Sequence, residues 1–135
     1  MRPVLDVGLA DLRLFLHLAA AVVWVGGQLV LTGLVPVLRR VSPEAAPAAG
    51  QRFAAIAWPA FAVLVVTGVW NIAAVGPAGG AYRATLVAKL VAVLVSGAAA
   101  WAHARAGSRR TLALTGALTG LAALLALFLG VVLRG

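Results

Sequence analysis

The chain alternates between long apolar stretches and short polar breaks. Four stretches, at approximately residues 11–38, 52–75, 82–106 and 111–133, are long enough to cross a bilayer, because about 20 apolar residues span its hydrocarbon core. The breaks between them are made of Arg, Gly, Pro and Ser, which are typical of helix ends. Because the connections are short, the pattern predicts an all-α, integral membrane four-helix bundle of up-and-down topology, with residues 1–135 as a single transmembrane domain.

Composition supports a membrane protein. Of the 135 residues, 64% are hydrophobic and only 10% are charged, a balance that excludes an ordinary soluble domain. The net charge of +8 does not indicate nucleic-acid binding, because the arginines sit singly or in pairs at the ends of apolar stretches and form no basic stripe. The expected partner is the lipid bilayer.

The arginines also predict the orientation. The side of the first and third connections holds six of them and the other side four: Arg39, Arg40, Arg52, Arg105, Arg109 and Arg110 against Arg2, Arg13, Arg83 and Arg134. Positive charge favours the cytoplasmic side. We therefore expect both termini to face away from the cytoplasm.

Two ionisable residues lie inside apolar stretches, His17 in the first and Lys89 in the third. Such a residue costs roughly 2.5 to 3.5 kcal/mol to insert, so each is a candidate functional residue. His17, Trp24 and Gln28 are spaced by seven and four, so all three are expected to project from one face of a helix, within about 20° of a common direction. These three residues and Lys89 are the candidate cofactor-binding set, and His17 is the candidate metal ligand.

Depth along the helices separates the other polar residues. At a rise of 1.5 Å per residue, His17 lies about 9 Å and Lys89 about 10 Å from the outer ends of their helices, with Thr67 near the same level. His103 lies about 31 Å along its helix by the same count, so we expect it at the opposite interface and outside the site of His17.

We expect the threonines of the last apolar stretch and the glycines of the chain to have structural roles and no chemical one. Thr111, Thr115 and Thr119 are expected to hydrogen-bond to carbonyls of their own helix. Helix contacts are expected at Gly26, Gly27, Gly97, Gly116 and Gly120, because small residues let membrane helices approach closely.

Three segments together resemble a known family. They are His17-Leu-Ala-Ala-Ala-Val-Val-Trp24-Val-Gly26-Gly27, Thr67-Gly68-Val69-Trp70-Asn71, and Tyr82 followed by Leu86 and Lys89-Leu90. Over residues 14–95 this order resembles the membrane domain of the copper-resistance protein D (CopD) family. The resemblance implies copper homeostasis or copper transport in the bacterial inner membrane, and the arginine count then predicts that both termini are periplasmic. Because His17 alone cannot complete a copper site, a partner chain or a periplasmic copper-binding partner is expected. Because family members carry more helices than four, a dimer or other homo-oligomer is expected as well.

Two alternatives stay open. His17 and Lys89 are also similar to residues of the HemJ-type protoporphyrinogen oxidases, which implies haem b held by His17, with Lys89 as a second ligand or a partner of a propionate. Copper(I) prefers sulfur ligands, whereas cysteine is absent and Met1 is the only methionine. The third hypothesis is a non-catalytic membrane subunit whose polar residues only hold the helices together. No catalytic residue is assigned.

Overall fold

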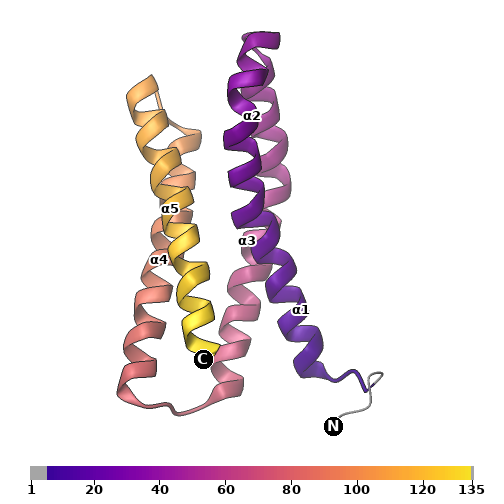
Figure 1. Ribbon diagram of the computed structural model, residues 1–135, viewed down its shortest axis with the longest axis vertical. Coiled ribbons are helices and arrows are strands. Elements are labelled where there is room, and N and C mark those ends of the chain that lie inside the picture. The colour runs from indigo at the N-terminus through magenta and orange to yellow at the C-terminus, as the bar shows by residue number, and fades with distance from the viewer. Residues whose placement is uncertain (1–5, 135) are drawn as a thin grey trace. The chain divides into compact units, whose positions relative to one another are not determined.

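The computed structural model describes residues 6–134, which are helical over most of their length (Figure 1). The helices are α1 (Leu9–Ala21), the π-helical segment η1 (Val22–Gly26), α2 (Gly27–Val41), α3 (Ala45–Val75), α4 (Gly80–Ala104) and α5 (Arg109–Arg134). Since α1, η1 and α2 are continuous, residues 6–134 contain four helices that are long and apolar enough to cross a membrane. The all-α prediction with four spans is confirmed. Met1 and Arg2, used above, lie outside the described residues.

The helix ends differ most from prediction at the first connection. The turn occupies only the three residues between Val41 and Ala45, and α3 begins at Ala45 instead of residue 52. Pro47 lies between the first two predicted stretches, yet it is the third residue of α3, where a backbone N–H has no helical partner to lose. The alanines around it are strong helix formers, so the helix extends to the turn.

The first membrane-spanning helix contains an irregularity that the pattern did not predict. Val22–Gly26 is a π-helix, in which hydrogen bonds run from i to i+5 and each turn holds more residues than an α-turn. The helix after Gly26 is therefore rotated from the register that a 3.6-residue count assigns. His17 and Trp24 nevertheless both contact α3, and the common face of His17, Trp24 and Gln28 stays a prediction.

The chain forms two compact units, Met1–Gly76 and Pro77–Gly135. In the first, the continuous helix α1–η1–α2 packs against α3; in the second, α4 packs against α5. Each unit is an antiparallel helical hairpin, called below the first hairpin and the second hairpin. The packing of both into one bundle and a single domain stays a prediction.

Small residues line both hairpins. The buried apolar residues are mostly alanines: Ala20 and Ala57 in the first hairpin and Ala92, Ala99, Ala122, Ala123 and Ala126 in the second. A β-carbon on Gly27 would overlap the Phe53 ring of α3, whereas one on Gly26 would meet nothing within 4 Å. Of the two adjacent glycines, Gly27 is thus the one that the helix contact requires.

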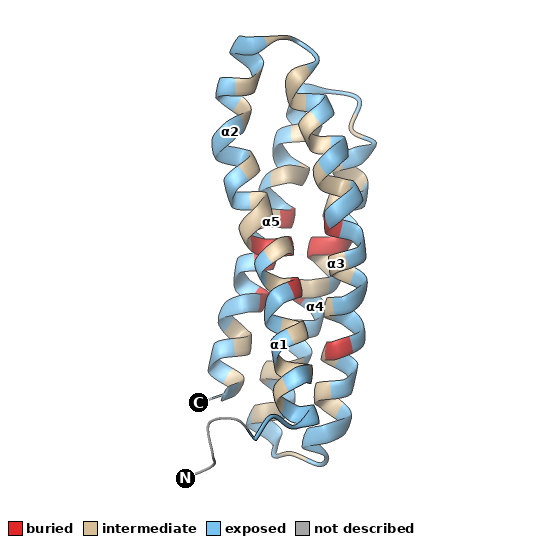
Figure 2. Cartoon of the chain, turned by 90° about the vertical axis from the view of Figure 1, so that its right-hand side faces the viewer, coloured by how far each residue is buried: buried red, intermediate tan, exposed pale blue. Residues whose placement is uncertain are grey.

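Large apolar side chains point outward along all the spans. Phe15, Val66, Leu94 and Leu121 each expose 65 to 69% of their surface, and the buried residues lie mainly along the middle of the helices (Figure 2). In water such a surface would drive aggregation, whereas lipid tails cover it without cost. The outward surface is therefore suited to a bilayer.

Candidate functional site

His17 is held between the two helices of the first hairpin. Its Nδ1 lies 2.8 Å from the hydroxyl of Thr67 on α3, and Thr67 is only 3% exposed. The ring also lies against Gly68, where an added β-carbon would be 3.6 Å from Cε1. Residues fifty positions apart in sequence are thereby brought into direct contact, and both belong to the segments that carry the family resemblance.

The hydrogen bonds of Thr67 assign the tautomer of His17. The Thr67 hydroxyl donates to the carbonyl of Val63 at 2.6 Å, so its single proton is used within α3. The contact with His17 is then one in which Nδ1–H donates and the threonine oxygen accepts. In this neutral tautomer Nε2 carries the lone pair, which is the atom that a metal ion would take.

Arg13 lies one helical turn before His17 and faces the same helix. Its guanidinium lies 5.7 Å from the centre of the Trp70 ring, and its Nε is buried with no hydrogen-bond partner among residues 6–134. Arg13 and His17 are four residues apart, so both project toward α3. A cation and an imidazole thus occupy the end of the first hairpin that carries the N-terminus.

Asp11 has a structural role at the start of α1. Its Oδ2 accepts a hydrogen bond from the Gly8 N–H at 3.0 Å, which caps the helix. Six residues of α-helix separate Asp11 from His17 and turn the two side chains about 120° apart. The Asp11 carboxylate therefore does not approach the imidazole from its own helix.

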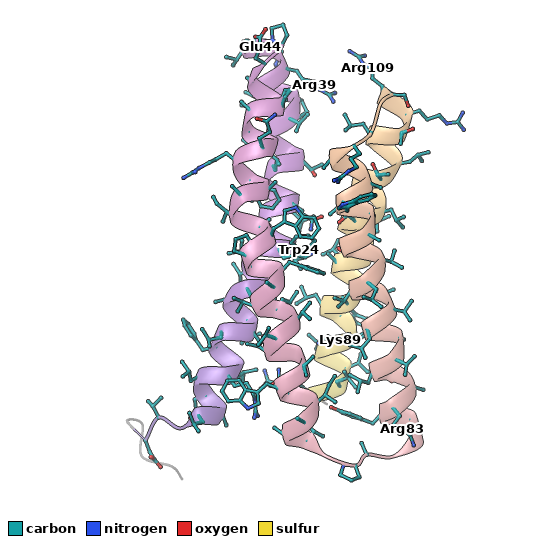
Figure 3. The ribbon with its side chains drawn as sticks, turned by 180° about the vertical axis from the view of Figure 1, so that it is seen from behind. Trp24, Arg39, Glu44, Arg83, Lys89 and Arg109 are labelled. Atoms are coloured by element: carbon teal, nitrogen blue, oxygen red, sulfur yellow. The ribbon has the colours of Figure 1, made fainter. Side chains whose placement is uncertain are left out.

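Trp24 packs in an aromatic cluster of the first hairpin. It is 3% exposed, and its ring centre lies 5.3 Å from that of Trp58 and 4.5 Å from that of Phe61. Edge-on and tilted contacts at these separations stabilise aromatic pairs. The cluster holds α3 against η1, and Figure 3 labels Trp24.

Gln28 follows the π-helical segment and carries an amide whose Nε2 and Oε1 are both buried without a hydrogen-bond partner in the described part of the chain. A buried amide without partners is costly, so Gln28 is the most poorly satisfied polar side chain of the first hairpin. Its assignment to a cofactor stays a prediction.

Lys89 belongs to the second hairpin and is partly buried. Its Nζ lies 2.9 Å from the position that a β-carbon on Gly130 of α5 would occupy, so the side chain extends toward the neighbouring helix (Figure 3). The missing side chain at Gly130 makes room for the ammonium group. Equal depth of Lys89 and His17 stays a prediction.

The second hairpin has its own polar contacts. Ser96 donates to the Thr119 carbonyl at 2.8 Å, and Thr119 donates to the Ser96 carbonyl at 2.7 Å. Thr119 was expected to bond within its own helix, and the structure corrects this, because its hydroxyl crosses to α4. Thr115 does bond within its helix, to the Thr111 carbonyl at 2.6 Å.

His103 has partners that the sequence pattern did not indicate. Its Nδ1 lies 2.9 Å from the Leu112 carbonyl and 3.1 Å from the Thr115 hydroxyl, both on α5. Thr-Gly occurs four times in the sequence, at residues 32–33, 67–68, 115–116 and 119–120, and the structure places a histidine against the second and third of them. The dipeptide alone therefore could not have identified these partners from the sequence.

Comparisons with known proteins add no assignment. No family model, no curated protein and no solved structure matches this chain. The chemistry must therefore be argued from the residues. The described residues contain no group of three or more His, Cys, Asp or Glu side chains that could hold a metal ion.

Proposed function

We propose that this chain is a bacterial inner-membrane protein of copper homeostasis or copper transport, of the copper-resistance D type, in which His17 binds the copper ion that is moved. The observation that carries the proposal is the contact of His17 with Thr67. It joins two segments of the family resemblance and fixes the imidazole in the tautomer that presents Nε2 to a metal.

One imidazole suits copper but does not complete its coordination. Imidazole is a good ligand for copper, whereas copper(I) prefers sulfur, and the chain has no cysteine. Copper is therefore cargo in this proposal, and its remaining ligands come from a periplasmic donor protein or from a second copy of the chain. Because the remaining ligands come from another chain, the proposed function requires a dimer or a transient partner.

Haem b is the second candidate. It is favoured by the same single imidazole, because one histidine nitrogen is sufficient as an axial ligand of haem iron. In this alternative His17 would hold the iron, and Lys89 would supply a positive charge for a propionate or a second ligand. Bound haem would provide electron transfer or oxidation chemistry.

The proposed orientation places both termini in the periplasm. It is supported by the six arginines at the first and third connections against four on the other side. Arg39 near the first turn and Arg109 near the last are labelled in Figure 3. His17 then lies in the periplasmic half of the membrane, where a periplasmic donor reaches it.

The test is copper binding by the full chain in detergent. Copper(I) is supplied from a coloured chelator, and the copper retained is measured for the parent, His17→Ala, Thr67→Val and Thr67→Ser. We expect His17→Ala to lower the copper content, and Thr67→Val to weaken binding at this site by about 10- to 100-fold because the imidazole loses its orienting partner. Thr67→Ser keeps the hydroxyl and should bind like the parent.

Thr85→Val is the matched control. The Thr85 hydroxyl bonds only to the Ala81 carbonyl of its own helix, at 3.0 Å, so its loss should leave copper binding unchanged. An absorption spectrum separates the candidates, because bound haem gives an intense visible band that His17→Ala should abolish and Lys89→Met should shift. Equal copper content, spectrum and cellular copper tolerance in the parent and His17→Ala would leave His17 with a packing role, as in a non-catalytic subunit.

A further inference from the structure

The charged side chains of the second hairpin are all positive. Residues 77–135 contain five arginines and one lysine but no aspartate or glutamate, because the three acidic residues of the chain are Asp6, Asp11 and Glu44. Arginine stays charged at any physiological pH. An acidic partner for these arginines can therefore come only from outside the second hairpin.

Three of the five arginines lie at the turn between α4 and α5. Arg105 directly follows α4, and Arg109 and Arg110 are the first two residues of α5; all three are exposed. Arg83 and Arg134 lie at the opposite end of the same hairpin, in the first turn of α4 and the last turn of α5. Figure 3 labels Arg109 at one end and Arg83 at the other. The turn is thus the more positive end of the hairpin.

Hydrogen bonds tie the two helices together at this turn. The Ser108 hydroxyl oxygen accepts from the Thr111 N–H at 3.2 Å and caps the start of α5. The His103 ring bonds to the Leu112 carbonyl at 2.9 Å, and because a carbonyl can only accept, Nδ1–H is the donor. His103 thereby fastens the last turn of α4 to the first turn of α5. The backbone positions that carry the three arginines are held at a fixed spacing as a result.

The Arg105 side chain is also held in place. Its guanidinium lies 3.9 Å from the centre of the Trp101 ring, in a cation–π contact. Trp101 belongs to the last turn of α4 and exposes 56% of its surface. Tryptophan rings at the ends of membrane-spanning helices concentrate at the level of the lipid headgroups. The contact therefore keeps a guanidinium at the level of the lipid phosphates.

The chemistry of this turn fits a phospholipid better than another anion. The guanidinium group presents its N–H donors as a fork that matches two oxygens of a phosphate. Directly beyond the arginines, α5 exposes apolar side chains along its first turns, with Leu114 at 61% and Leu118 at 50%. A phospholipid carries a phosphate next to acyl chains and matches both parts of this surface. A nucleic acid or an acidic protein would match only the charged part.

We propose that the turn between α4 and α5 binds the headgroup of an acidic phospholipid. Arg105, Arg109 and Arg110 supply the positive charge for its phosphate, and its acyl chains lie along the exposed leucines at the start of α5. Each arginine near a membrane surface strengthens the binding of acidic lipid by about fivefold. The inference does not rest on the proposed copper function, because none of these residues takes part in the contacts of His17.

The test is lipid binding by the full chain in detergent, measured by native mass spectrometry with phosphatidylglycerol and with the neutral phosphatidylcholine. We expect the parent to bind phosphatidylglycerol more tightly. The double variant Arg109→Gln/Arg110→Gln should weaken this binding by about 25-fold and leave phosphatidylcholine binding unchanged. Arg83→Gln/Arg134→Gln is the matched control, because it removes the same charge from the other end of the hairpin, and it should bind like the parent.

Substitutions of Trp101 test the position of Arg105 without changing any charge. Trp101→Leu removes the aromatic face and should weaken phosphatidylglycerol binding, up to the loss of about fivefold expected for Arg105→Gln. Trp101→Phe keeps an aromatic face and should bind like the parent. Both positions are exposed, so these substitutions leave the packing of α4 against α5 intact.

Three results would contradict the proposal. Equal losses in the two double variants would mean that binding follows the net charge of the chain and not this turn. Equal binding of the two lipids by the parent would exclude recognition of an acidic headgroup. Inorganic phosphate and glycerol phosphate are added as competitors, and neither should displace the lipid because both lack acyl chains. Displacement by either one at an equal concentration would show that the turn takes a phosphate from solution and that the lipid is not its ligand.

Discussion

At the scale of single residues, the sequence identified the chemical groups better than their partners. His17 and Thr67 were placed at one level by counting residues along helices, and the structure joins them at 2.8 Å. His103 was expected at an interface, but its bonds to Leu112 and Thr115 were not foreseen. Periodicity gives the face of a helix from which a residue projects, whereas the residue it meets depends on how two helices approach.

The glycines that contact the two histidine rings predict different effects of a glycine-to-alanine substitution. A β-carbon on Gly116 would lie 3.0 Å from Cε1 and 3.2 Å from Nδ1 of His103, closer than a rigid ring tolerates, whereas on Gly68 it would make an ordinary contact at 3.6 Å. We expect Gly116→Ala to lower the free energy of unfolding by about 1 to 3 kcal/mol. Gly68→Ala should be neutral or should stabilise by up to about 1 kcal/mol through helix propensity.

Thermal unfolding of both variants in the same detergent makes this comparison. Gly130→Ala is the control, because a β-carbon there would meet Lys89 Nζ at 2.9 Å, at the far end of a flexible side chain that can move away. A Gly116→Ala protein as stable as Gly68→Ala would mean that the His103 ring is not held against α5 as described.

At the scale of helices, hydropathy predicted all four spans and missed their local irregularities. The reason is that about 20 apolar residues are required for a span whatever their detailed order. The sequence therefore determines strongly that each span exists and that it is a helix. The early start of α3 at Ala45 depends on the tolerance of proline in a first turn. The π-helical segment Val22–Gly26 changes the hydrogen-bond register of the helix without changing its hydropathy, so a hydropathy pattern does not reveal it.

The reciprocal pair of Ser96 and Thr119 is the clearest polar contact between two helices. Both side chains are buried, at 1% and 6% exposure, and each donates to the backbone of the other. Hydrogen bonds between membrane helices contribute about 0.6 kcal/mol on average and at most about 1.7. We expect Ser96→Ala and Thr119→Val each to destabilise the second hairpin by about 0.5 to 2 kcal/mol.

A double-mutant cycle on the unfolding free energy tests whether the two act as a unit. The double variant should lose less than the sum of the single variants, because removing one side chain already breaks part of the shared network. Strict additivity would contradict the pairing. Thr85→Val, whose hydroxyl bonds only within α4, should show no coupling to Thr119→Val.

At the scale of the whole molecule, the orientation decides what His17 can do. The arginines at the first and third connections predict that both termini are periplasmic, and under the proposed function a periplasmic copper donor would then reach His17. The inverted orientation would turn His17 toward the cytoplasm without changing a single contact within the first hairpin. The proposed function therefore depends on topology as much as on the binding residue.

Reporter fusions measure this orientation. A reporter that is active only in the cytoplasm, fused after Gly135, should give no signal, and one that is active only in the periplasm should give a strong signal at the same position. Insertion of the same reporters into the turn between Val41 and Ala45, which joins α2 to α3, is the matched control and should give the reverse pattern, because the two positions are separated by three crossings. A strong signal from the cytoplasmic reporter at the C-terminus would show that the orientation is the inverse of the predicted one. His17 would then face the cytoplasm, where a periplasmic copper donor cannot reach it, and the proposed binding of periplasmic copper at His17 would be wrong.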